Sequence, residues 1–257
     1  MIKMQEPPTK KPSWLKVKLR TTDNFKDMKH LMSTHSLNTV CEEARCPNIY
    51  ECWENKTATI MILGNICTRS CGFCSVKTGR GSFVDQREPL NTALAVNKLG
   101  LKHVVITSVD RDDLKNDYGA DIWAQTVLNV RDLNPDCTIE ILTPDFKGYT
   151  PSINKVFESS PDIFSHNIEC VERISKKVRS QSDWKRSKEL LRYSVHYGLL
   201  TKTGIMVGLG ENDKEVFETI EEIASLGVHI FNIGQYLQPT KKHLIVDRYV
   251  HPEKFKE

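Results

Sequence analysis

The sequence predicts an α/β protein with a partial (β/α)6 TIM-like barrel, preceded by an irregular N-terminal extension. Short β-branched runs alternate with longer helical patterns, which is typical of βαβ units and a parallel sheet. The alternation begins only near residue 57. Reactive side chains follow several of the runs, and this favours a barrel over a doubly wound sheet, because barrels build their active sites at the carboxyl ends of strands.

Composition and charge exclude several classes of protein. The 257 residues are 39% hydrophobic and 27% charged, which is enough for a sizeable core. The formal net charge of +3 is too small to indicate nucleic-acid binding. No apolar run approaches the roughly 18 residues of a membrane span, and residues 1–12 have no apolar signal-peptide segment. We therefore expect a cytoplasmic protein with no membrane or nucleic-acid partner.

Residues 1–56 are predicted to form the extension, and residues 57–257 the barrel. The extension is polar and contains Pro7, Pro8, Pro12 and Pro47, which interrupt regular structure. It also contains a basic leader that either is solvated coil or docks an acidic partner. The leader's charged residues are Lys10, Lys11, Lys16, Lys18 and Arg20.

Six runs rich in aliphatic and β-branched residues predict the parallel strands. These runs are Thr57–Leu63, His103–Thr107, Thr138–Leu142, Ile163–Ile168, Gly204–Val207 and His229–Ile233. Longer patterns between them predict helices, and in the last pattern apolar residues recur at steps of three and four. The predicted helices are Leu90–Leu99, Asp121–Leu133, Ile153–Glu158, Asp183–His196 and Lys214–Leu226.

Polar side chains come directly after several predicted strands. Cys67 follows the first strand, residues 108–113 follow the second, and residues 208–211 follow the fifth. Asn167 and Glu169 lie at the end of the fourth. We expect these residues to share one end of the barrel, where active sites form.

The first cysteine triplet, Cys67-x3-Cys71-x2-Cys74, is the strongest chemical signal. In a reducing compartment, clustered cysteines hold metal more often than they form disulfides. A zinc site usually takes four ligands, whereas three thiols on one loop suit a cubane iron–sulfur cluster with one iron left open. Buried structural cysteines are the less favoured alternative, because Arg69 and Ser70 lie between them.

A second triplet, Cys41-x4-Cys46-x5-Cys52, lies upstream in the extension. Its spacing does not fit a zinc finger and is loose enough to wrap a cubane cluster. Cys137 and Cys170 have no partner at ligand spacing and are predicted to be small buried hydrophobes.

The first triplet, with Phe73 before its last cysteine, resembles the signature of the radical S-adenosylmethionine superfamily. Both triplets together resemble the lipoyl synthase family, and the resemblance covers nearly the whole chain from about residue 12. Further segments that carry it are 14–18, 42–48, 77–80, 105–114, 206–211 and 234–240.

The resemblance implies an enzyme that inserts two sulfur atoms at C6 and C8 of an octanoyl chain. That chain is amide-linked to a lysine of a carrier protein or lipoyl domain. Cys67, Cys71 and Cys74 would be the catalytic ligands of a [4Fe–4S] cluster that cleaves S-adenosylmethionine to a radical. Cys41, Cys46 and Cys52 would hold an auxiliary [4Fe–4S] cluster that is consumed as the sulfur source. A reductant protein and iron–sulfur cluster assembly proteins are the other implied partners.

The resemblance also implies contacts to S-adenosylmethionine. Gly208 and Glu211 belong to a glycine motif that shapes the adenine pocket, although glycines in a βα turn are common for backbone reasons. Asp110 would bind the methionyl amine or the substrate, although residues 110–113 also fit a solvated charge run. Asn167, Glu169 and Arg179 would contact the ribose and the methionyl carboxylate.

One family feature is not in these 257 residues. Lipoyl synthases end in an Arg-Ser-Ser-Tyr motif whose serine is understood to complete the auxiliary cluster. The sequence leaves open whether it is a fragment or a natural variant, and in either case we expect a labile auxiliary cluster.

Two alternatives remain at this level. One is another sulfur-inserting radical enzyme, such as a methylthiotransferase or biotin synthase, but the first would need room for an RNA-binding domain. The other is a non-catalytic module stabilised by zinc. A brown colour would exclude zinc, because a d¹⁰ ion has no visible transition.

Overall fold

The computed structural model describes residues 10–16, 22–34, 38–46, 48–54, 57, 59–81 and 83–257. In this part of the chain a seven-stranded sheet runs in the order β1-β2-β5-β6-β7-β8-β9. Only β1 is antiparallel to its neighbour; the other six strands are parallel, and no ladder joins β9 back to β1 among the described residues. The strands are β1 (Asn38–Thr39), β2 (Thr59–Ile62), β5 (His103–Ser108), β6 (Thr138–Leu142), β7 (Ile163–Ser165), β8 (Thr201–Val207) and β9 (Ile230–Gln235). The predicted partial barrel with six parallel strands is confirmed.

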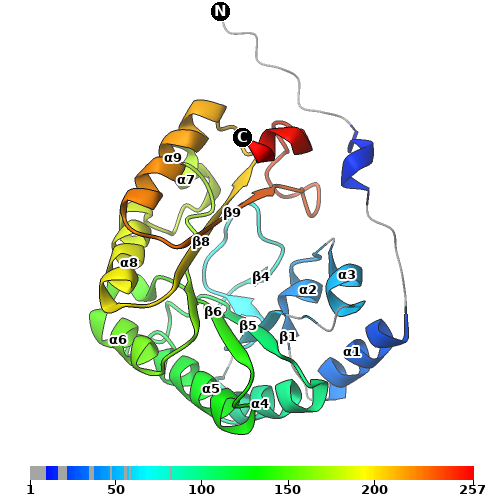
Figure 1. The fold of residues 1–257 in the computed structure, drawn as a ribbon, viewed down its shortest axis with the longest axis vertical. Coiled ribbons are helices and arrows are strands. Elements are labelled where there is room, and N and C mark those ends of the chain that lie inside the picture. Colours follow the sequence, from blue (N-terminus) through cyan, green and yellow to red (C-terminus); the bar gives the residue numbers. More distant parts are fainter. Residues whose placement is uncertain are drawn as a thin grey trace, which may run out of the picture.

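Helices cover the convex side of the curved sheet, and Figure 1 shows α4, α5, α6, α8 and α9 as an arc around it. The helices of the barrel are α4 (Glu88–Leu99), α5 (Ala120–Leu133), α6 (Thr150–Glu158), α7 (Glu172–Val178), α8 (Trp184–Tyr197) and α9 (Asp213–Ser225). Five were predicted to within a few residues. The exception is α7, which has only seven residues and too few apolar positions to show a helical period.

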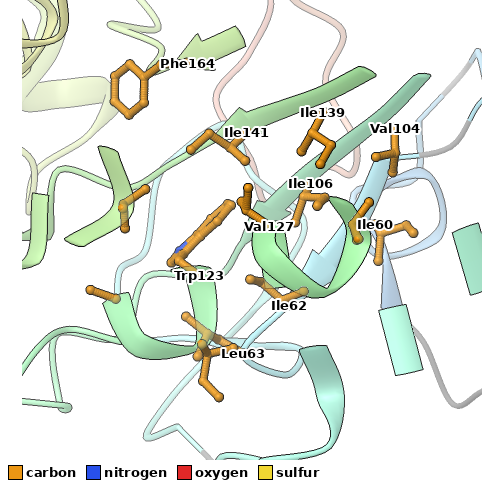
Figure 2. Packing of buried hydrophobic residues seen from close by; sticks show 14 of the residues in the cluster. Ile60, Ile62, Leu63, Val104, Ile106, Trp123, Val127, Ile139, Ile141 and Phe164 are labelled. Atoms are coloured by element: carbon orange, nitrogen blue, oxygen red, sulfur yellow. The ribbon is translucent and has the colours of Figure 1, made fainter. Parts of the chain in front are cut away.

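Strand alternation separates an outer core from the barrel interior. Ile60 and Ile62 of β2 are fully buried against the helices, as are Ile139 and Ile141 of β6. Figure 2 shows these side chains and Trp123 of α5 among the residues of this core. Each such burial contributes about 1.5–3 kcal/mol to folding. The alternate residues of the same strands therefore point into the barrel, where they are free to line a cavity.

The described part of the extension is largely helical rather than irregular, and this corrects the prediction. It contains α1 (Asp23–Thr34), α2 (Val40–Glu43) and α3 (Ile49–Glu54) after a short 3₁₀ turn, η1 (Ser13–Leu15). Met32, Cys41 and Trp53 form a small buried cluster among these helices. The helices are held by packing between segments distant in sequence, which local periodicity does not reveal.

The extension also adds an edge strand to the barrel, because β1 pairs with β2. The boundary at residue 56 stays a prediction. Lys18 and Arg20 of the basic leader, together with Pro7, Pro8 and Pro47, lie outside the described residues. Among the described helices, none is long and apolar enough to cross a membrane.

Candidate active site

A cavity of about 390 Å³ lies at the carboxyl ends of β2, β5, β6 and β7. The first cysteine triplet forms one part of its wall, together with residues that follow the strands. Two residues of the extension, Val40 next to Cys41 and Ala44 between Cys41 and Cys46, also line the cavity. Polar lining residues after the strands are Asp110, Thr143, His166, Asn167 and Glu169, with Arg179 after α7.

Backbone hydrogen bonds shape the loop that carries the first triplet. It begins in β3 (Ile66–Cys67), which pairs with β4 (Lys77–Thr78) on the far side of the loop. The sulfur of Cys67 accepts hydrogen bonds from the backbone N–H groups of Arg69 and Asp110, both at 3.4 Å. The loop is thus closed on itself and joined to the end of β5.

Arg69 ties this loop to the barrel through a buried ion cluster. Its side chain is only 2% exposed, and its guanidinium nitrogens lie 3.2 Å from Asp110, 2.8 Å from Asp112 and 2.6 Å from Asp145. Asp110 and Asp112 follow β5, whereas Asp145 follows β6. The pairing holds the pKa of Asp145 well below its usual range despite the burial that opposes ionisation. The sequence argument used Arg69 to disfavour buried structural cysteines, yet Arg69 itself is buried, because three carboxylates compensate its charge.

A segment after β9, residues 236–246, crosses the same loop, and we call it the strap. The ring Nε2 of His243 lies 2.9 Å from the carbonyl oxygen of Cys74. The backbone N–H of Leu244 donates to the carbonyl of Gly72 at 2.9 Å. A Cβ atom at Gly72 would lie 2.9 Å from the Leu244 side chain, so a larger residue here would force the Leu244 side chain or the strap to shift.

Burial raises the pKa of all three thiols in the first triplet, to about 11 for Cys67 and about 12 for Cys71. The Asp110 carboxylate raises these pKa values further, while Arg179 opposes the rise at Cys71. The thiols therefore keep their protons until a cationic group displaces them. This donor set fits a metal cluster, whose positive iron stabilises the thiolates.

The second triplet is also drawn together by the fold. Cys41 lies in α2 and Cys52 in α3, and the N–H of Cys46 donates to the carbonyl of Cys41 at 3.0 Å. Burial raises the pKa of Cys41 and Cys52, and charge on the neighbouring cysteines raises both further. The thiols are therefore close enough to interact electrostatically.

Among the described residues, no three Cys, His, Asp or Glu side chains converge on one point as the ligands of a single metal ion do. A cubane cluster does not require such convergence, because each thiolate binds a different iron. The cavity also suits a polar ligand. Thr143 Oγ1 and Arg179 Nε are buried without a hydrogen-bond partner in the described structure, and Asp110 Oδ1 has only its ion pair with Arg69.

The predicted S-adenosylmethionine contacts divide into two groups. Asp110, Asn167, Glu169 and Arg179 line the cavity together, whereas Gly208 and Glu211 are not part of its lining. The Glu211 carboxylate accepts the N–H of Gly208 at 2.7 Å and lies 3.3 Å from Arg248. A Cβ at Gly208 would lie 2.5 Å from the Arg248 carbonyl oxygen. The geometry therefore favours a backbone role for Gly208, because a side chain at this position would clash with the neighbouring backbone.

Several site residues were missed from sequence. Thr143 and Asp145 come just after the third predicted strand. Active sites of barrels form at the carboxyl ends of strands, so this position could have identified both residues. His166 is buried, with its ring nitrogens 2.8 Å from the Thr143 carbonyl and 2.9 Å from the Ser187 hydroxyl. No local signal marks it. Cys137 and Cys170 are buried free thiols, as predicted.

An open parallel barrel with a three-cysteine loop at its carboxyl end defines a radical S-adenosylmethionine (SAM) enzyme. The Radical SAM superfamily model matches residues 61–223. Methylornithine synthase has a similar structure, with a TM-score of 0.58 and 14% identity over 85% of this chain and 66% of that chain. Streptococcus suis SuiB bound to S-adenosylmethionine has a TM-score of 0.61 and 14% sequence identity, over 87% of this chain and 53% of that chain. At these identities the structures show the shared fold alone.

Closer relatives identify the family. The N-terminal domain of lipoyl synthase of the radical SAM family matches residues 2–46. The mitochondrial lipoyl synthase of Nematostella vectensis is 50% identical over 96% of this chain and 85% of its own length. The lipoyl synthase of Oceanobacillus iheyensis is 51% identical over 98% of this chain and 81% of its own length. The chain belongs to the lipoyl synthase family. It is a sulfur-inserting radical enzyme that uses S-adenosylmethionine and a [4Fe–4S] cluster.

Replacing Arg69 with Met should lower the free energy of unfolding by about 3–5 kcal/mol, because it removes the cation that Asp110, Asp112 and Asp145 share and leaves Asp110 without an ion-pair partner in the described structure. Arg192→Met, which breaks a surface pair with Glu189, is the control and should cost less than about 1 kcal/mol. Urea unfolding of the reduced, iron-free chain measures both. Equal losses in the two variants would show that the buried cluster is not a special source of stability.

His166 predicts a pH dependence of stability. Burial lowers its pKa from 6.5 to about 4. Between these values the unfolded chain binds a proton that the native chain does not, so stability falls as the pH falls. The loss is about 1.4 kcal/mol per pH unit, or about 3 kcal/mol in all. We expect the free energy of unfolding, measured at pH 7, 5.5 and 4, to depend less steeply on pH in His166→Gln than in the exposed control His196→Gln. Identical slopes would contradict the prediction.

Proposed function

We propose that Cys67, Cys71 and Cys74 ligate the radical-generating cluster, and that Cys41, Cys46 and Cys52 ligate an auxiliary [4Fe–4S] cluster. One observation carries the proposal: a single cavity is lined by the first triplet, by Val40 next to Cys41, and by Ala44 between Cys41 and Cys46. A chain bound in this cavity contacts both segments. When bound, the clusters and S-adenosylmethionine supply the radical and the sulfur.

The polar part of the cavity offers complementary charges for S-adenosylmethionine. Arg179 Nη1 donates to the carbonyls of Asn167 and Ile168, at 3.0 and 3.2 Å, whereas its buried Nε has no partner among the described residues. This N–H is thus available to the methionyl carboxylate. Asp110 and Glu169 provide acceptors for the methionyl ammonium and the ribose hydroxyls. Gly208 and Glu211 would act only indirectly, by holding the end of β8.

The apolar part of the cavity suits the octanoyl chain. Met61, Val105 and Leu142 point into it from β2, β5 and β6. Each methylene removed from water there contributes about 0.8 kcal/mol to binding. The same side chains exclude water from the carbons that react. The substrate is therefore an octanoyl group on a protein lysine, presented by a carrier protein or lipoyl domain.

The remaining partners follow from the proposed chemistry. A reductant protein supplies the electron for each cleavage of S-adenosylmethionine, and iron–sulfur cluster assembly proteins replace a consumed auxiliary cluster. All eight cysteines are free thiols, as expected in the reducing cytoplasm that we propose as the working compartment.

The first test concerns cluster ligation. Wild-type chain reconstituted without oxygen should contain about 8 iron and about 8 sulfide. Changing Cys67, Cys71 and Cys74 together to Ala should halve both contents and abolish S-adenosylmethionine cleavage. The double variant Cys137→Ala/Cys170→Ala is the matched control and should keep the wild-type content. If the triple variant still cleaves S-adenosylmethionine, the radical cluster is held elsewhere.

The second test separates the roles of the triplets. Changing Cys41, Cys46 and Cys52 together to Ala should leave S-adenosylmethionine cleavage measurable, because the other triplet lies on a different loop. The lipoyl product should disappear, because its sulfur source is lost. Mass spectrometry of an octanoyl-lysyl peptide detects the product. Continued product formation by this variant would mean that the sulfur has another origin.

A further inference from the structure

The cavity opens to solvent beside β4. Thr78 of that strand is exposed and also belongs to the cavity lining. Two segments lie next to this opening. One comprises β4 and the residues 79–81 and 83 after it, and here the N–H of Gly79 donates to the carbonyl of Cys67 at 2.9 Å. The other is the strap, which is hydrogen-bonded to the carbonyls of Gly72 and Cys74. We take both segments as the surface that a protein meets when its lysine side chain enters the cavity here.

Both segments present cations to solvent. Lys77, Lys241 and Lys242 are exposed, and none forms an ion pair with another residue of the described ranges. Arg80 is exposed nearby, close enough to Asp113 to help lower the pKa of that carboxyl. Four exposed cations therefore lie on these two segments, although the whole chain has a net charge of only +3.

The same segments carry the two most exposed large hydrophobic side chains of the described structure. Phe83 is 89% exposed and Ile245 is 65% exposed. Val84, which follows Phe83, packs on the core, and the backbone N–H of Leu244, which precedes Ile245, donates to the carbonyl of Gly72. Exposed apolar side chains on a fixed backbone are typical of protein-binding surfaces, because little ordering is left to occur on binding.

We propose that Lys77, Phe83, Lys241, Lys242 and Ile245 form a docking rim for the carrier protein, and that the carrier presents an acidic surface around its acylated lysine. The inference rests on the proposed function, because a lysine-linked octanoyl chain reaches the cavity only when its protein settles at the opening. Cations complement an acidic partner and speed its encounter, while the two apolar side chains supply buried contact. The rim thus selects the carrier before the chain enters.

The test compares a protein substrate with a small one. The probes are an octanoylated carrier domain of net negative charge and an uncharged octanoyl-lysyl tripeptide. With the cluster-loaded enzyme at low salt, Lys241→Glu/Lys242→Glu should bind the domain about tenfold more weakly. At about 0.5 M salt the variant and the wild type should converge, because exposed charges are screened. Cleavage of S-adenosylmethionine with the tripeptide should be unchanged, since the tripeptide does not reach the rim.

Matched variants locate the effect. Lys98→Glu/Lys102→Glu makes the same charge change at the amino end of β5, away from the opening, and should bind the domain like the wild type. Phe83→Ala should weaken binding of the domain at both salt concentrations, because its contribution is apolar. Equal weakening by the rim and control pairs would overturn the proposal, as would an effect confined to Lys10→Glu/Lys11→Glu in the leader.

Two failures remain distinguishable. If the wild-type enzyme does not cleave S-adenosylmethionine with the tripeptide, the proposed function itself fails. If the tripeptide is converted but the rim variants bind the carrier domain normally, only the docking rim is wrong.

Discussion

The buried guanidinium of Arg69 is the interaction on which the geometry of the site depends. Removing a guanidinium from water costs several kcal/mol unless opposite charges compensate it. Here the compensation comes from Asp110, Asp112 and Asp145, at the ends of two adjacent strands. Asp145 also binds Arg186 of α8 at 3.0 Å. Because Arg69 stands between two cysteines of the first triplet, this network fixes the cysteine loop to β5, β6 and α8 at once.

The two cysteine triplets rest on different supports, and this suits the different roles proposed for them. The first is held by the ion cluster and by the strap, which are part of the barrel. The second lies on short helices packed around Met32 and Trp53. Parts of a protein with different packing, such as the barrel and these short helices, can differ in local stability. The proposed auxiliary cluster would thus rest on the short helices of the extension, whereas the first triplet is anchored to the sheet by the ion cluster.

The fold was largely predictable because its signals are local. A β-branched run next to an amphipathic pattern indicates a βα unit wherever it occurs, and five of the six barrel helices and all six parallel strands followed from it. The extension was the exception. Its helices at residues 23–34 and 49–54 pack on each other, for example through Phe25 and Trp53, whose ring centroids are 5.0 Å apart. A contact between distant residues leaves no periodic pattern in the sequence.

For the site, the sequence by itself determined the chemistry, since the spacing of Cys67, Cys71 and Cys74 and of the upstream triplet states which donor atoms are available and how many. Tertiary structure decided which polar residues join them. It brought Asp145 and the strap to the cysteine loop and His166 to the cavity lining. It also buried Arg69 among three carboxylates and set Gly208 and Glu211 outside the cavity. The reason is physical: a donor set is encoded by neighbours along the chain, whereas charge compensation and cavity lining arise between residues that only the folded barrel brings together.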